Sequence, residues 1–149
     1  MSMFSSFDIN ASGLTAQRYR MDIISENVAN ANTTRTADGS PYRRKVVSFE
    51  EKEGQTPFHK VLHNVTASNY SGQGVKVARV FEDKETDMKM VYDPSHPDAD
   101  ENGYVTYPNV NIVTEMTDLI DASRAYEANA TAFNASKSIA LQGLQLSQN

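Results

Sequence analysis

The chain has 149 residues, with 14 Lys or Arg against 19 Asp or Glu, so its formal net charge is −5 when the three histidines are neutral. Hydrophobic residues make up only 39% of the sequence, a low share for a chain that folds around a large core of its own. This composition argues against a compact enzyme, and the acidic balance argues against general nucleic-acid binding. The absence of cysteine excludes disulfides, thiolate chemistry and cysteine zinc sites.

Membrane insertion and a cleaved secretory signal are not expected from the hydropathy of the chain. No run approaches the roughly 18 consecutive apolar residues that a membrane-spanning helix needs. The first ten residues have neither a basic start nor an apolar stretch, both of which a secretory signal would show.

A helix is predicted from Phe4 to about Asn32, a stretch that contains no proline. Its apolar residues recur at steps of seven, three and four, the spacing of a helix that offers one narrow stripe to a partner. Gly13 lowers helix propensity by roughly 1 kcal/mol relative to alanine, so the first turns are weak. The predicted stripe consists of Leu14, Met21, Ile24, Val28 and Ala31, with Phe7 one heptad earlier.

The middle of the chain, 35–107, has short β-branched and aromatic runs separated by Gly, Pro and charged residues, which is typical of strands and turns. Within it, 71–74 (SGQG) is predicted to be a turn, and Lys76, Arg79 and Lys84 a solvated face. The stretch 50–69 has no clear period and is not assigned. The predicted strands are Tyr42–Phe49, Val75–Phe81, Met88–Tyr92 and Tyr104–Tyr107.

A second and longer helix is predicted after Pro108, from Asn111 to Ser147, with Asn109 or Asn111 as its N-cap. At about 1.5 Å per residue it would be roughly 55 Å long, which suits a rod-like element better than a compact domain. Its many alanines allow close approach but bury little apolar area. The apolar and small positions at heptad spacing are Ile112, Met116, Leu119, Tyr126, Ala130, Phe133 and Leu144.

These elements predict an α+β fold in which two long terminal helices pair as an antiparallel coiled coil around a small β-rich middle region. The predicted parts are an N-terminal helix in 1–34, the middle region in 35–107 and a C-terminal helix in 108–149. A helix pair whose seam buries so little apolar area should be only marginally stable by itself. It should gain most stability when several copies pack side by side. A plain coiled coil within one subunit is the simpler interpretation of the same pattern.

A calcium loop is the most specific chemical motif considered, because Asp98, Asp100, Asn102 and Gly103 match its first six positions, D-x-D-x-N-G. The bidentate glutamate is missing, since Asn109 stands at its position. Prolines precede the loop where a helix should be, and 104–107 reads as extended. A polar turn in which Gly103 supplies a positive φ is therefore the favoured interpretation.

The other candidate constellations are incomplete. His59 and His63 are four apart, but Lys60 replaces the glutamate of the metalloprotease motif, so exposed or structural histidines are expected. The basic run 43–45 predicts a charged strand face or a contact with an acidic neighbour. No nucleophile, base and orienting acid occur together, so no enzymatic activity, cofactor or metal is predicted.

Several segments closely resemble the flagellar basal-body rod proteins, which belong to the flagellar axial protein family. The asparagine-rich end of the first helix resembles a motif common to axial proteins, although Glu26 stands where asparagine is usual. The proline-rich loop and SRAYEAN at 123–129 are similar to proteins of the proximal rod in particular. The resemblance covers nearly the whole chain and is carried by 24–32 (ISENVANAN), 42–45 (YRRK), 91–105 (VYDPSHPDADENGYV) and 107–140.

The resemblance implies a structural subunit of the proximal rod, which carries torque from the motor to the hook. It implies export through the flagellar type III channel without a cleaved signal, and a place in the rod that spans the periplasm. The implied partners are copies of itself, other rod proteins, the base of the rod at the membrane ring and the export apparatus. The assembly seam predicted from the heptad pattern and this resemblance together is Leu14, Met21, Ile24, Val28, Ile112, Met116, Leu119, Tyr126, Ala130, Phe133 and Leu144.

Two other functions remain open on the sequence alone. A soluble coiled-coil adaptor would use the same helices to bind one cytoplasmic partner, and its location in the cell would distinguish it from a rod subunit. A calcium-binding module would use Asp98, Asp100 and Asn102, and calcium titration would decide between it and a polar turn.

Overall fold

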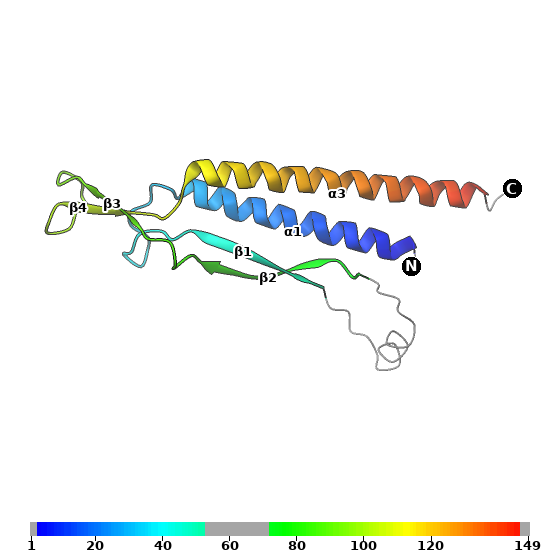
Figure 1. The fold of residues 1–149 in the computed structure, drawn as a ribbon, viewed down its shortest axis with the longest axis horizontal. Coiled ribbons are helices and arrows are strands. Elements are labelled where there is room, and N and C mark those ends of the chain that lie inside the picture. Colours follow the sequence, from blue (N-terminus) through cyan, green and yellow to red (C-terminus); the bar gives the residue numbers. More distant parts are fainter. Residues whose placement is uncertain (1–2, 53–71, 147–149) are drawn as a thin grey trace, which may run out of the picture.

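The computed structural model describes residues 3–52 and 72–146 (Figure 1). Two long helices lie side by side, a two-stranded ribbon runs along one of them, and a second, smaller ribbon lies at one end of the molecule. This arrangement confirms the predicted α+β class. The elements in chain order are α1 (Met3–Ala29), β1 (Lys45–Glu51), β2 (Val75–Glu82), β3 (Lys89–Tyr92), β4 (Tyr104–Tyr107) and α3 (Ile112–Leu146).

The two helices are antiparallel, and both chain ends lie at the same end of the pair (Figure 1). Near that end, the rings of Phe7 and Phe133 meet edge to face with centroids 5.1 Å apart. Near the other end, the amide of Asn27 donates to the carboxylate of Glu115 at 3.0 Å. The helices therefore contact each other along nearly all of α1. At about 1.5 Å per residue, the 35 residues of α3 span about 52 Å.

The ribbon of β1 and β2 packs on the opposite side of α1 from α3, so the molecule has three layers (Figure 1). The strands are antiparallel, with Val46 opposite Phe81 and Glu51 opposite Val75. A β-bulge interrupts the register after Ser48. Side chains alternate between the two faces of a ribbon, and the Val75–Val77 end contacts α1 in a hollow that includes Ser12. The second face of this ribbon is directed away from the helices.

The smaller ribbon pairs β3 with β4, with Tyr92 opposite Tyr104. Gly103 precedes β4 with φ of 81°, as predicted for the turn. Gly74 likewise has φ of 92° at the entry to β2. A side chain at Gly74 would collide with Ser12, since a Cβ atom there would lie 2.2 Å from its Oγ.

The end of the first helix and the start of the first strand differ from the predicted positions. The first helix ends at Ala29 rather than near Asn32, because the chain turns there and Thr33 N donates to the carbonyl of Asn30. The first strand begins at Lys45 rather than at Tyr42. Its preceding residue, Arg44, donates its backbone N–H to the side chain of Asn109 instead of to a strand.

The N-cap of α3 is Asn111, one of the two predicted candidates. Its Oδ1 accepts hydrogen bonds from the backbone N–H groups of Val113 at 3.1 Å and Thr114 at 3.5 Å. These donors have no partner inside the helix, so the cap stabilises the first turn. Asn109 instead bonds the loop before β3, as described below.

The hydrophobic core is small, in keeping with the composition. Among residues 3–52 and 72–146, the buried hydrophobic side chains are Ala16, Ile24, Ala31, Tyr42, Val105 and Ala122. Two further side chains in the centre of the molecule are polar: Asn27 is 1% exposed and Glu115 is fully buried. Polar contacts, more than apolar area, therefore fix how the helices meet the middle region.

Candidate assembly site: the helix seam and its polar junction

The seam between α1 and α3 has a central row of small and polar residues at intervals of seven. On α1 this row is Ser6, Gly13, Arg20 and Asn27, and on α3 it is Ser136, Asn129, Ala122 and Glu115. Each step of seven forward along α1 matches a step of seven back along α3. The hydroxyls of Ser6 and Ser136 lie 3.2 Å apart, and a Cβ atom on Gly13 would lie 2.8 Å from Oδ1 of Asn129. Small side chains in this row let the helix backbones approach closely.

The predicted seam residues lie beside this row, and the protomer encloses only part of them. On α1, Ile24 is buried, and Leu14, Met21 and Val28 are half-buried. On α3, Leu119, Ala130 and Phe133 are half-buried. The remaining four, all on α3, are exposed in the protomer: Ile112, Met116, Tyr126 and Leu144. Their role in contacts between subunits stays a prediction.

Further apolar side chains on α3 are exposed next to these four. They cluster in the first turns of the helix and again at its end, where the exposed fraction of Leu146 reaches 80%. In the register of the seam, Met3 is level with Ile139, so the last turns of α3 extend beyond the described start of α1 (Figure 1). The additional exposed residues are Val113, Ile120, Ile139, Leu141 and Leu146.

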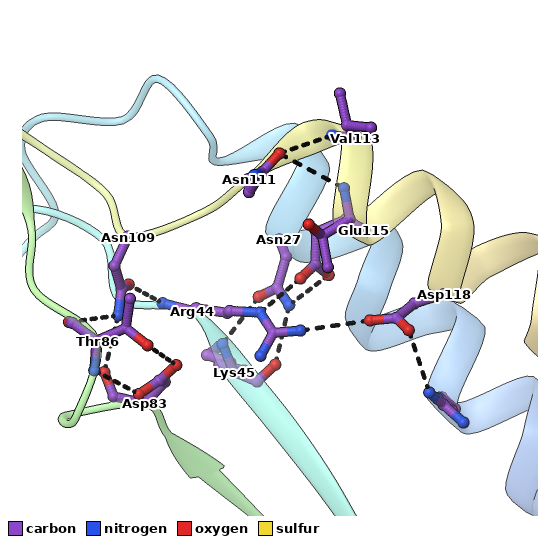
Figure 2. A network of polar contacts seen from close by, with 12 residues as sticks. Asn27, Arg44, Lys45, Asp83, Thr86, Asn109, Asn111, Val113, Glu115 and Asp118 are labelled. Atoms are coloured by element: carbon purple, nitrogen blue, oxygen red, sulfur yellow. Dashed lines mark hydrogen bonds and ion pairs between the residues drawn. The ribbon is translucent and has the colours of Figure 1, made fainter.

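A network of polar side chains closes the other end of the seam, where the helices meet β1 (Figure 2). Asn27 is its centre. Its Nδ2 donates to Glu115 at 3.0 Å and to the carbonyl of Lys45 at 2.9 Å. Its Oδ1 accepts from the Tyr42 hydroxyl and from the Lys45 N–H, both at 2.9 Å. An amide side chain has two donors and two acceptor positions, so every one of them is used.

Arg44 joins the same network from the start of β1. Its Nε donates to Oε1 of Glu115, and its Nη2 lies 3.5 Å from the carboxylate of Asp118. Asp118 is shared, because Nη2 of Arg20 lies 3.6 Å from its other oxygen. The charge of the fully buried Glu115 is thus compensated by a guanidinium and an amide, as burial of a carboxylate requires.

The network continues into the loop between β2 and β3 through Asn109 (Figure 2). Its Oδ1 accepts from the backbone N–H of Arg44 at 2.9 Å. Its Nδ2 donates to the carbonyls of Asp83 at 2.9 Å and Thr86 at 3.2 Å. Four segments of the chain, at Asn27, 42–45, 83–86 and 109–115, are therefore tied together at one point, which we call the polar junction. Its members are Asn27, Tyr42, Arg44, Asn109 and Glu115.

The polar junction changes the acid–base behaviour of one of its members. Burial, followed by the negative charges of Glu26, Glu115 and Glu82, raises the pKa of the Tyr42 hydroxyl to about 12. The hydroxyl therefore stays protonated at neutral pH and donates a hydrogen bond to Oδ1 of Asn27. Glu26, which replaces the usual asparagine of the axial motif, pairs with Lys45 of the same chain.

The basic run 43–45 is thus engaged inside the protomer, where Arg44 and Lys45 contact acidic residues. Lys76, Arg79 and Lys84 are exposed, as predicted for a solvated face.

The residues of the calcium motif form hydrogen-bonded turns. Asp98 accepts from Thr34 at 2.8 Å and pairs with Arg35 at 3.5 Å, while Oδ1 of Asp100 accepts from the backbone N–H groups of Asn102 and Tyr104. Within 3–52 and 72–146, no three His, Asp or Glu side chains are grouped as a metal site would need. His59 and His63 lie outside the described residues. Neither long helix, over its described length, is apolar enough to cross a lipid bilayer.

Comparison with known proteins agrees with this architecture. The family model for the flagella basal body rod protein matches residues 7–35, which contain most of α1. The model for the C-terminal part of the flagellar basal body rod FlgEFG proteins matches 101–146, which contains β4 and α3. The chain is therefore a protein of the flagellar rod class, a structural component of the flagellar basal body.

Relatives of nearly equal length define the family more narrowly. The chain is 47% identical to the flagellar basal-body rod protein FlgC of Borreliella burgdorferi, over 99% of both chains. It is 45% identical to FlgC of Bacillus subtilis, over 98% of this chain and 99% of that protein, and 40% identical to FlgC of Salmonella typhimurium, over 99% and 100%. The chain belongs to the FlgC family of flagellar basal-body rod proteins.

The polar junction was not predicted from the sequence, although its residues lie in segments that resemble the family. Apolar spacing marks the residues beside the central row of the seam, whereas the row itself consists of polar or small residues. Its members on α1 share no residue class, since they are a serine, a glycine, an arginine and an asparagine, so residue periodicity gives no signal for the row.

Proposed function

We propose that this rod subunit assembles through its two terminal helices into the proximal rod, and that it carries torque from the motor toward the hook without catalysing a reaction. Its partners are copies of itself, other rod proteins, the base of the rod at the membrane ring and, during delivery, the export apparatus. It reaches the periplasm-spanning rod by flagellar type III export without a cleaved signal. The predicted three parts, 1–34, 35–107 and 108–149, serve respectively as helix, middle region and helix in this assembly.

The observation that carries this proposal is the outer face of α3. One face of α3 packs on α1, and its remaining faces have apolar side chains in water at both ends of the helix. Single exposed apolar residues are ordinary, but a continuous helix with this many favours burial against neighbours. A contact that joins two different faces of identical subunits cannot close as a two-fold dimer, and it generates a helical assembly when the rotation between subunits does not close into a ring.

The test of location is mass spectrometry on gradient-purified basal bodies from the bacterium that has this gene. We expect the chain there in a fixed ratio to other rod proteins. Recovery of the chain only from the soluble cytoplasmic fraction would contradict assembly into the rod and favour the adaptor function.

The test of the helix surface is Tyr126→Asp, introduced as the sole copy of the gene. Tyr126 is partly exposed on α3, so the protomer should tolerate the change, whereas a charge buried between subunits is costly. We expect the variant to be exported but not incorporated into basal bodies, with loss of swimming. Tyr126→Phe, which keeps the ring, is the matched control and should swim normally. Normal swimming of Tyr126→Asp would remove Tyr126 from the assembly seam.

A further inference from the structure

The outer face of the β3–β4 ribbon is an exposed aromatic surface that no element of the described protomer covers. Tyr92 lies opposite Tyr104, and Met90 lies opposite Thr106, so these four share one face. Met90 is 61% exposed and Tyr92 is 64% exposed. On the other face Val105 is fully buried, so the ribbon has one inner and one outer side. We call Met90, Tyr92, Tyr104 and Thr106 the aromatic face.

The aromatic face is held in place by several contacts within the protomer. The rings of Tyr92 and Tyr104 pack edge to face with centroids 5.3 Å apart. Gly103 allows this packing, since a Cβ atom there would lie 3.0 Å from Cε2 of Tyr92. The loop between the strands is closed by the bond from Asp93 N to the Gly103 carbonyl at 2.9 Å, and Asp98 ties it to Thr34. A surface ordered in advance loses little entropy on binding.

The loop beside the aromatic face is mostly acidic, although Arg35 pairs with one of its carboxylates, that of Asp98. The loop 93–103 contains four acidic residues and no Lys or Arg. Hydrogen bonds from Ser95 lower the pKa of Asp93, so its carboxylate is ionised at neutral pH. A complementary partner surface should therefore be basic and should offer apolar or aromatic contact area.

The outer face of the β1–β2 ribbon has these properties. Arg79 and Phe81 are both exposed there, and the guanidinium carbon of Arg79 lies 5.1 Å from the centre of the Phe81 ring. Lys76 is exposed farther along the same strand, where it lies opposite Glu50 and pairs with its carboxylate at 3.5 Å, so the unpaired positive charge of this face is that of Arg79. Arg79 has no ion pair within 3–52 and 72–146, so its charge is available to a partner. We call Lys76, Arg79 and Phe81 the basic face.

We propose that the aromatic face of one copy of this chain docks on the basic face of a second copy. The two faces belong to different ribbons, so the contact is heterologous and continues from copy to copy instead of closing into a dimer. It rests on the proposed function, because it requires several copies in one assembly. It adds to the helix contacts a second contact, made by the middle region, that offsets successive copies along the long axis of the molecule.

Cross-linking between cysteines tests the contact directly, because the native chain has none. Met90→Cys together with Arg79→Cys is expressed as the sole copy, and purified basal bodies are treated with a short bis-maleimide. We expect cross-linked dimers and higher oligomers of this chain from the double variant and only monomer from each single variant. Dimers from a single variant, or an adduct of the Met90→Cys variant with a different protein, would overturn the proposal.

The outcomes separate the two proposals. If basal bodies contain the double variant and the cells swim, but no cross-link forms, the docking contact is wrong while the rod function stands. If the unmodified chain is absent from basal bodies, the rod function itself fails, and the contact fails with it.

Charge reversal gives a second measurement that does not depend on cysteine chemistry. Arg79→Glu and Glu101→Lys each place like charges together, so each should reduce the basal-body yield of the chain. The combined variant should recover most of that yield. Glu85→Lys, an exposed site in the turn after β2, makes the same charge change outside both faces and should have no effect. Equal yields from all variants would overturn the contact.

Discussion

The two ends of the helix pair are built from different interactions. At the polar junction, Asn27 and Glu115 are buried and every polar group of the Asn27 side chain has a partner within the protomer. At the far end, one hydroxyl contact joins Ser6 to Ser136, and α3 continues past it with exposed leucines. Directional polar bonds fix the junction end, whereas a hydroxyl pair and the edge-to-face rings of Phe7 and Phe133 join the helices at the far end.

This difference suggests a division of tasks between the ends. A saturated hydrogen-bond network specifies one geometry, because each displaced group would be left buried without a partner. Apolar surface tolerates several neighbours with different shapes. The junction therefore sets the angle between the helices and the middle region in each protomer, while the exposed apolar side chains at both ends of α3 are suited to contacts with other subunits.

The largest predicted effect comes from removing the buried charge. Glu115→Ala leaves the guanidinium of Arg44 and one N–H of Asn27 without their partner, and breaking such a buried pair lowers the free energy of unfolding by about 3–5 kcal/mol. Urea denaturation followed by circular dichroism measures the loss. Ser136→Ala at the far end is the control, with an expected loss below about 1.5 kcal/mol. Equal losses at both sites would contradict the contrast between the ends.

The next effect concerns the amide of Asn27. Asn27→Ala leaves the Tyr42 hydroxyl and the Lys45 N–H facing a buried space, and an unsatisfied buried group lowers the free energy of unfolding by about 1–3 kcal/mol. Thermal and urea unfolding should both show the loss. Asn134→Ala, an exposed site on α3, should be neutral or slightly stabilising because alanine favours the helix. If Asn27→Ala behaves like this control, the junction does not hold the helices.

Apolar spacing is sufficient to predict both helices and their antiparallel pairing, and the β-branched and aromatic runs between turn residues predict the strands of the middle region. The same spacing marks Ile24, Leu119 and Phe133, which are buried or half-buried in the protomer. It could not find the row of Ser6, Gly13 and Asn27, because small and polar residues do not reveal which face they occupy.

The polar junction could not be predicted from the sequence for a further reason. Arg44 and Glu115 are 71 residues apart, and their pairing depends on where the chain returns after the β-ribbons. Asn109 illustrates the same limit: it reads as a helix cap, and only the position of the loop at Asp83 shows that it bonds that loop instead.

A smaller effect compares two glycines of the helices. Alanine favours a helix over glycine by about 1 kcal/mol, and nothing lies within 4 Å of a Cβ atom on Gly143, so Gly143→Ala should stabilise the chain by up to that amount. At Gly13 the same atom would collide with Asn129, whose amide is held by the Ala125 carbonyl at 2.8 Å. Overpacking of about 1–3 kcal/mol should then outweigh the gain. Melting temperatures that shift in the same direction for both variants would contradict close packing at Gly13.

The last prediction concerns how the free energy of unfolding depends on pH, a dependence on Tyr42 that appears only in alkaline solution. The pKa of Tyr42 is about 12 in the folded chain and close to the ordinary value of 10.0 in the unfolded chain, so between these values the folded state binds the proton more tightly. The stabilisation from the protonated hydroxyl is complete below pH 10 and is lost as the pH rises toward 12. Urea unfolding at several pH values should show a steeper alkaline decline in the native chain than in Tyr42→Phe, which has no hydroxyl to titrate. Tyr92→Phe, at an exposed tyrosine on the β3–β4 ribbon, should decline as steeply as the native chain. Parallel curves for the native chain and Tyr42→Phe would mean that the Tyr42 hydroxyl is in a water-like environment. The junction end of the helix pair would then exclude water no better than the far end.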